Sequence, residues 1–231
     1  MPSLLASFSF VVLIGCLAAQ RPSGSCDFQE LQRCQAAFND EMKIQRDLSV
    51  QDYDKLSRSI QTVWANNGAA GVQTTCNAFK SFKTCFINSD HYYNCVQDPL
   101  KLLIDSNGTA TGITREQSYG YDKIFNQFDF ACGAGFMGFA NNDACGSTVF
   151  NMRTRDLDNC QNAFIQNVNT TPQNACSFVA IAKQCVSDVF ASQCPNAPEM
   201  AWWGCQYELS GTQLLFPQCT QIFCTYNEQR R

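Results

Sequence analysis

The fold of this chain is decided by two stretches that share one cysteine pattern, CNAFKSFKTCFINSDHYYNC over residues 76–95 and CSFVAIAKQCVSDVFASQC over residues 176–194. The cysteines are separated by eight and nine residues in the first stretch, and by eight and eight in the second. Phe79, Phe82 and Phe86 recur at three- and four-residue steps, which is the spacing of one helix face. We therefore expect cysteine-bearing helices in both stretches.

A helix holds the first two cysteines of each stretch too far apart to pair with each other. Nine residues of helix place Cys76 about 13.5 Å from Cys85 and on the opposite face, whereas a disulfide needs Cα atoms within about 7 Å. The same arithmetic applies to Cys176 and Cys185. The eight-residue helical step from Cys26 to Cys34 is also too long for a disulfide. Each helix is therefore expected to offer its cysteines to different neighbouring segments.

The similarity extends upstream of the two stretches. CQAAF over residues 34–38 matches CQNAF over residues 160–164, and a further cysteine precedes each of them. The second interval is seven residues longer, close to two helical turns, so the same face is kept. We interpret this as two diverged cysteine-rich helical repeats, residues 20–138 and 139–231. The alternative is chance spacing in a helical chain rich in cysteine.

Helical periodicity dominates the rest of the chain, and alternating strand patterns are almost absent. The sequence therefore predicts an all-α fold, a disulfide-stapled helical bundle. Expected features are a helix over 27–48, a capping box at Ser49, a break at 66–71, a long helix over 149–168, and a stop at Ser210–Gly211. Helix starts are expected at Asp98–Pro99, Thr114, Thr171–Pro172 and Asn196–Pro198.

Composition limits the classes of function. Of 231 residues, 45% are hydrophobic and 16% charged, so the chain can bury a core and is not disordered. A net charge of −4 argues against a nucleic-acid-binding protein, which needs a basic face. His91 is the only histidine, which removes most metal and catalytic-triad chemistry.

The N-terminus predicts secretion. An uncharged apolar run over residues 4–17 is followed by Ala18 and Ala19, as in a signal peptide spanning residues 1–19. Fourteen residues are too few to span a bilayer, and no later stretch is expected to span one. The LIGC motif over residues 13–16 leaves open a bacterial lipoprotein anchor, but the many later cysteines favour a secreted, extracellular protein without a stable membrane anchor.

Removal of the signal peptide would leave an even number of cysteines, which predicts up to seven disulfides in an oxidising compartment. A zinc site is the weaker alternative, because no CxxC pair is present. Asn107 and Asn169 begin glycosylation sequons. The expected disulfide cysteines are Cys26, Cys34, Cys76, Cys85, Cys95, Cys132, Cys145, Cys160, Cys176, Cys185, Cys194, Cys205, Cys219 and Cys224.

Three motifs are candidates for a catalytic or cofactor site. GAGFMG over residues 133–138 fits the dinucleotide pattern G-x-G-x-x-G, but a helical stripe precedes it where a strand is required, which favours a hinge. His91 lacks an accompanying nucleophile motif and fits a structural role. The pairs Asp52/Asp54 and Asp156/Asp158 point to different helix faces and fit solvated surface. We therefore expect no catalytic, cofactor-binding or metal-binding residues and no cofactor.

Helical cysteine repeats behind a signal peptide resemble the secreted, cysteine-rich, all-helical proteins of invertebrates, of the mollusc shell-matrix or nematode extracellular-matrix type. The resemblance implies no particular site residues. The predicted function is a non-catalytic extracellular interaction or matrix protein with a protein or carbohydrate partner. A soluble carrier of a small hydrophobic molecule, its cavity lined by phenylalanines and Trp202–Trp203, is the second hypothesis, and an enzyme the third. The two adjacent tryptophans cannot both face inward on one helix.

Overall fold

The computed structural model describes residues 24–213 and 215–225, and the predicted signal peptide lies outside them. The described part is built from helices, with one isolated bridge between Ile104 and Ala110 and no longer strand. This confirms the all-α, disulfide-stapled bundle. The elements are α1 (Phe28–Met42), η1 (Val50–Asp52), α2 (Tyr53–Cys85), α3 (Ser89–Val96), η2 (Pro99–Leu102), α4 (Arg115–Ala131), α5 (Phe136–Ala140), α6 (Asp143–Met152), α7 (Thr154–Thr170), η3 (Pro172–Asn174), α8 (Ala175–Gln193) and α9 (Pro198–Gln213).

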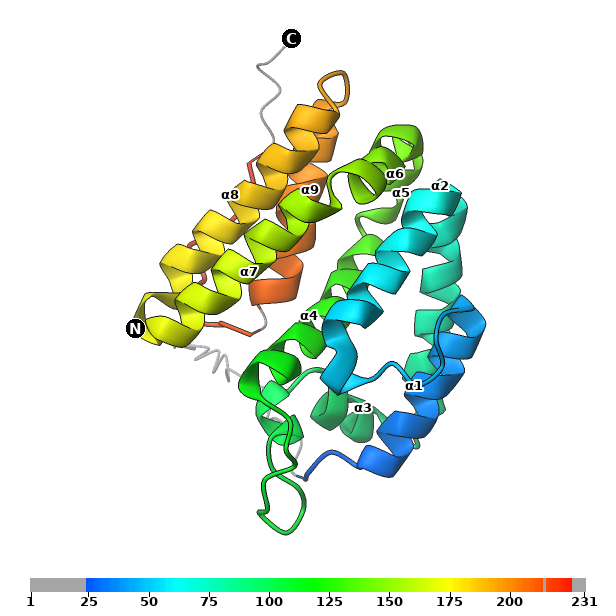
Figure 1. The fold of residues 1–231 in the computed structure, drawn as a ribbon, viewed down its shortest axis with the longest axis vertical. Coiled ribbons are helices and arrows are strands. Elements are labelled where there is room, and N and C mark those ends of the chain that lie inside the picture. Colours follow the sequence, from blue (N-terminus) through cyan, green and yellow to red (C-terminus); the bar gives the residue numbers. More distant parts are fainter. Residues whose placement is uncertain (1–23, 214, 226–231) are drawn as a thin grey trace, which may run out of the picture.

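The helices form two groups on either side of α4 (Figure 1). Helices α1, α2 and α3 lie on one side, α7, α8 and α9 on the other, and α4 packs against both α2 and α9. All residues from 120 to 128 are buried, so α4 is enclosed on all its faces. Because the helix has no solvent face along this length, its polar side chains are buried as well as its apolar ones.

Aromatic side chains fill a core that crosses the predicted boundary between residues 138 and 139. The ring centroid of Trp64 of α2 lies 5.1 Å from that of Phe150 of α6 and 5.8 Å from that of Tyr207 of α9. Within the first half, the rings of Phe82 and Phe125 stack at 4.6 Å. These phenylalanines therefore serve as packing residues, and one hydrophobic cluster contains residues of both halves.

Seven disulfides join the fourteen cysteines of the described residues, and each lies within one half. None joins Cys76 to Cys85 or Cys176 to Cys185, as helical geometry requires. The six cysteines of the first half pair in the same order as six of the second, and the seventh bond has no counterpart. The pairs are Cys26–Cys95, Cys34–Cys85 and Cys76–Cys132 in the first half, and Cys145–Cys194, Cys160–Cys185, Cys176–Cys219 and Cys205–Cys224 in the second. Descent of the halves from one duplicated unit stays a prediction.

Several helix boundaries follow the expected local chemistry. Thr114 accepts a hydrogen bond from the backbone of Gln117, whose side chain bonds back to the Thr114 backbone in a full capping box. Asp98 caps the 3-10 turn that begins at Pro99. Helix α9 begins at Pro198, as expected, but continues past Ser210–Gly211 to Gln213.

Four expected features differ in the structure. The helix expected over 27–48 ends at Met42, because Lys43 adopts a left-handed conformation with φ 55°. Ser49 makes no side-chain capping bond, so the capping box expected there is wrong. The long helix expected over 149–168 is two helices that meet at Arg153, and the break expected at 66–71 is a kink within α2 at Gly68, where φ is 55°.

Helix α8 differs from the expectation that no segment after the leader resembles a membrane span. Residues Pro172–Gln193 form a helix that is long and apolar enough to cross a membrane by length and composition alone. In the structure, α8 packs against α7 and α9, and Cys176, Cys185 and Cys194 on and beside it enter three disulfides. Its apolar composition is therefore also explained by its place in the second half.

Candidate functional site

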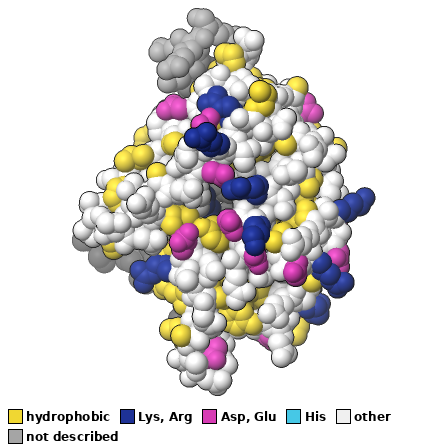
Figure 2. All heavy atoms as spheres, in the orientation of Figure 1, with side chains coloured by type: hydrophobic (Ala, Val, Ile, Leu, Met, Phe, Trp, Pro, Cys, Tyr) yellow, Lys and Arg dark blue, Asp and Glu magenta, His cyan; other side chains and the backbone are white. Residues whose placement is uncertain are grey.

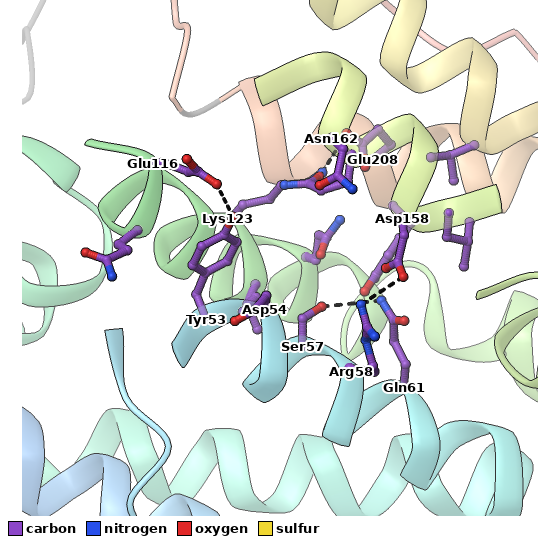
Figure 3. A pocket seen from close by; sticks show the side chains of 18 of the residues that line it. Tyr53, Asp54, Ser57, Arg58, Gln61, Glu116, Lys123, Asp158, Asn162 and Glu208 are labelled. Atoms are coloured by element: carbon purple, nitrogen blue, oxygen red, sulfur yellow. Dashed lines mark hydrogen bonds and ion pairs between the residues drawn. The ribbon is translucent and has the colours of Figure 1, made fainter. Parts of the chain in front are cut away.

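A cleft of about 570 Å³ lies where the two halves meet, between α2 and α4 of the first half and α7 and α9 of the second. The face in Figure 2 shows acidic and basic side chains gathered around a hollow near its centre, and Figure 3 shows the cleft from close by. Its volume is within the range of small-molecule sites. Amide side chains line much of it, namely Gln51, Gln61, Gln117, Gln127, Gln161 and Asn162.

A buried ion pair closes the inner part of the cleft. Lys123 Nζ of α4 lies 2.7 Å from Glu208 Oε1 of α9, and the two side chains are only 6% and 4% exposed. The same ammonium group donates to Gln161 Oε1 of α7. Burial of a charge is costly unless it is paired and hydrogen-bonded, so these contacts account for a lysine inside the otherwise enclosed α4.

A second ion pair crosses the cleft nearer to solvent. Arg58 of α2 donates to Asp158 Oδ2 of α7 at 2.9 Å, and both side chains are exposed. In each pair, the first half supplies the cation and the second half supplies the carboxylate. Both cationic side chains of the cleft are therefore engaged by the opposite half.

Tyr53 forms the outer wall of the cleft beside α4. Its ring lies against Gly120, where a Cβ atom would stand only 2.2 Å from the ring, so only glycine allows this approach. Its hydroxyl donates to Glu116 Oε1 at 2.9 Å. Burial, followed by the hydrogen bond to Glu116, raises the pKa of Tyr53 well above its usual range. The hydroxyl therefore stays a proton donor and holds Glu116 beside the cleft.

Two glutamines give the cleft unused hydrogen-bonding capacity. Gln127 is only 5% exposed and lines the cleft, and no hydrogen bond joins its amide to another described residue. Gln61 donates from Nε2 to Ser57 Oγ at 3.3 Å, while its shielded Oε1 atom has no partner. Buried polar groups in proteins are normally satisfied, so the shielded Gln61 Oε1 atom favours a polar occupant of the cleft, and the Gln127 amide, which remains accessible from the cleft, could bond to the same occupant.

Of the candidate residues named from the sequence, two aspartates line the cleft and the others lie elsewhere in the molecule. Asp54 and Asp158 line the cleft, so assigning both aspartate pairs to plain solvated surface missed part of the site. Their neighbours Asp52 and Asp156 instead form local ion pairs with Lys55 and Arg153.

His91 lies outside the cleft, where it links α3 to α1. Its Nδ1 atom is 2.5 Å from Glu30 Oε2, and Glu30 also accepts a hydrogen bond from the Ile87 backbone at 2.6 Å. Glu30 is buried, with a side chain only 5% exposed. These contacts give His91 a structural role between the helices, in agreement with the interpretation from the sequence.

The glycine motif over residues 133–138 connects α4 to α5, and the backbone oxygen of Gly135 accepts a hydrogen bond from Trp203 Nε1 at 2.8 Å. Trp203 is 1% exposed, whereas Trp202 is half-buried, so the two tryptophans do divide between the interior and the surface. The sequon residues Asn107 and Asn169 are both exposed. Glycosylation at either stays a prediction.

A second buried polar group of α4 lies outside the set of residues lining the cleft. Asp122 is fully buried, and neither of its carboxylate oxygens has a hydrogen-bond partner. Asn126, one helical turn further on, also has an unpartnered amide. Burial, and then the nearby charge of Asp98, raise the pKa of Asp122 well above its usual range. Asp122 therefore favours its neutral, protonated form in the folded protein.

Within the described residues, no group of three or more histidine, cysteine, aspartate or glutamate side chains is placed to hold a metal ion. The carboxylates, cations and amides that line the cleft offer hydrogen bonds and charge pairing to a bound molecule. Ser57 accepts its hydrogen bond from an amide, which cannot act as a base toward the hydroxyl. Comparison with protein-family models, curated proteins and solved structures finds no match to this chain.

Proposed function

We propose that this protein is a secreted, non-catalytic extracellular binding protein that holds a polar ligand in the cleft between its two halves. The observation that carries the proposal is the polar lining of the cleft, in which the shielded Gln61 Oε1 atom has no partner and the Gln127 amide bonds to no other described residue. A bound polar group would satisfy the Gln61 oxygen and use the free hydrogen-bonding groups of Gln127.

The disulfides support the extracellular setting. Seven intramolecular disulfides indicate an oxidising extracellular or secretory environment, because cytosolic reductants keep thiols reduced. The bonds also make each half rigid, which lowers the entropic cost of ordering a binding site.

The character of the lining favours a polar ligand over an apolar one. A carrier of a hydrophobic molecule needs a predominantly apolar pocket, whereas amides, hydroxyls and charged groups line this cleft. A protein or carbohydrate matrix would present suitable polar groups, so the predicted matrix partner is compatible with the same site.

Native mass spectrometry of the secreted protein, incubated with the small-molecule fraction of extracellular fluid, tests the proposal. The expected result is a one-to-one adduct that is lost in Gln127→Met, which keeps the side-chain length but removes the amide. Gln166→Met, at an exposed position of α7, is the matched control and should keep the adduct. Equal occupancy in both variants would place the ligand elsewhere and contradict the proposal.

A further inference from the structure

The outer end of the cleft carries two carboxylates that form no salt bridge among the described residues. Asp54 and Glu116 both line the cleft beside Tyr53, and the charges of both contribute to the raised pKa of Tyr53. Lys55, next to Asp54 in the sequence, lies outside the cleft lining, is exposed and bonds to Asp52 at 2.9 Å. Its charge also interacts with that of Asp54, but without a direct ion pair.

The charges of the whole lining lead to the same conclusion. Four carboxylates (Asp54, Glu116, Asp158 and Glu208) face two cations (Arg58 and Lys123), which leaves two negative charges in excess. Both cations are already bound by the carboxylates of the second half. The excess therefore resides at Asp54 and Glu116, where it repels anionic ligands and attracts cationic ones.

The inner part of the cleft offers a different kind of contact. Gln127, a residue that is 5% exposed and whose amide bonds to no other described residue, and the shielded Gln61 Oε1 atom present uncharged hydrogen-bonding groups. These amides are an observation independent of the two carboxylates at the outer end of the cleft, Asp54 and Glu116. A ligand that fits both regions has a cationic group at one end and a neutral hydroxyl or amide group at the other.

We propose that the cleft selects a small primary amine whose opposite end carries a hydroxyl or amide group. This inference rests on the proposed function and names its class of ligand. The ammonium group donates to Asp54 and Glu116 in charge-assisted hydrogen bonds, and the half-buried ring of Tyr53 offers a face for the cation. The polar end of the ligand bonds to the amides of Gln61 and Gln127.

Isothermal titration with three probes of one shape tests the charge preference. Tyramine, tyrosol and 4-hydroxyphenylacetate share a phenol ring and end in an ammonium, a hydroxyl and a carboxylate group. Tyramine should bind about tenfold more tightly than tyrosol, the carboxylate should bind most weakly, and the preference for tyramine should decrease at high salt.

A double variant at the outer end of the cleft tests whether Asp54 and Glu116 cause the preference for tyramine. In Asp54→Asn/Glu116→Gln the tyramine preference should vanish, and since both side chains are exposed, the melting temperature should change little. Asp188→Asn/Glu199→Gln, which removes two charges outside the cleft lining, is the matched control and should keep the preference. An unchanged preference for tyramine in Asp54→Asn/Glu116→Gln would overturn the inference. So would binding of 4-hydroxyphenylacetate to the wild type that is as tight as that of tyramine or tighter.

The outcomes distinguish this inference from the proposed function. If all three probes bind equally and lose affinity in Gln127→Met, the cleft is a polar binding site and only the amine selectivity is wrong. If no probe binds while an extracellular ligand forms a Gln127-dependent adduct, the amine inference again fails alone. If neither probes nor extract produce such binding, both proposals fail.

Discussion

Replacement of Lys123 by methionine tests the buried ion pair on which the inner part of the cleft depends. The change keeps the aliphatic length but removes the ammonium group, leaving the Glu208 carboxylate 4% exposed without a cation. Breaking a buried pair in this way costs about 3–5 kcal/mol, mostly because the remaining charge stays buried. In a chain of this size each kcal/mol lowers the melting temperature by about 2–4 °C, so we expect a loss of about 6–20 °C.

Two further variants separate the pair from its surroundings. Lys123→Met combined with Glu208→Leu removes both charges, and it should recover most of the lost stability because neither charge remains unpaired. Arg58→Met breaks the exposed pair with Asp158, for which we expect a loss of about 0–1 kcal/mol. Calorimetric melting and denaturant titration of the disulfide-intact proteins measure all three. If the single Lys123 variant melted like the Arg58 variant, or the double variant were as unstable as the single one, our account of the pair would be refuted.

Three other predictions concern the core and the surface. Burial raises the pKa of Asp122 in the folded state, so the contribution of Asp122 to stability should fall as pH rises above about 4; the gain in stability of Asp122→Asn over the wild type should therefore increase with pH, whereas the exposed-site change Asp188→Asn should leave the pH profile as it is. Trp203→Ala should cost about 3–5 kcal/mol in denaturant titration, because the indole is buried and stacks on its neighbours, and Trp202→Ala should cost clearly less. In an Asn169→Gln background, Asn107→Gln should abolish a glycosidase-sensitive mobility shift of the secreted protein; absence of that shift when Asn107 is the remaining sequon would contradict the glycan prediction.

The sequence predicts the framework of this fold better than its site. Cysteine spacing and apolar periodicity indicate an all-helical, cross-linked chain, since both depend on local geometry. The capping box at Thr114 is likewise readable from neighbouring residues. The end of α1 at Met42 is not, because it depends on a left-handed residue at Lys43, which is not a glycine.

The cleft was missed because its residues come together only through tertiary packing. Lys123 and Glu208 are 85 residues apart, and each looks like an ordinary polar position when a helix is assumed to have a solvent face. Helix α4 has no such face over residues 120–128. One signal for the buried pair is present in the sequence. Only 16% of the residues are charged, and Lys123 stands directly before the apolar pair Ile124–Phe125, which indicates a lysine that needs a charged partner.

The central claim is that two halves, each cross-linked only within itself, meet through noncovalent contacts and leave the polar cleft between them. Peptide mapping of the unreduced, secreted protein tests this claim most directly. We expect seven cross-linked peptide pairs, all within residues 26–132 or within residues 145–224, including Cys76–Cys132 and Cys176–Cys219. A disulfide between the two ranges would contradict the claim, and a Cys76–Cys85 bond would contradict the helical geometry on which it rests.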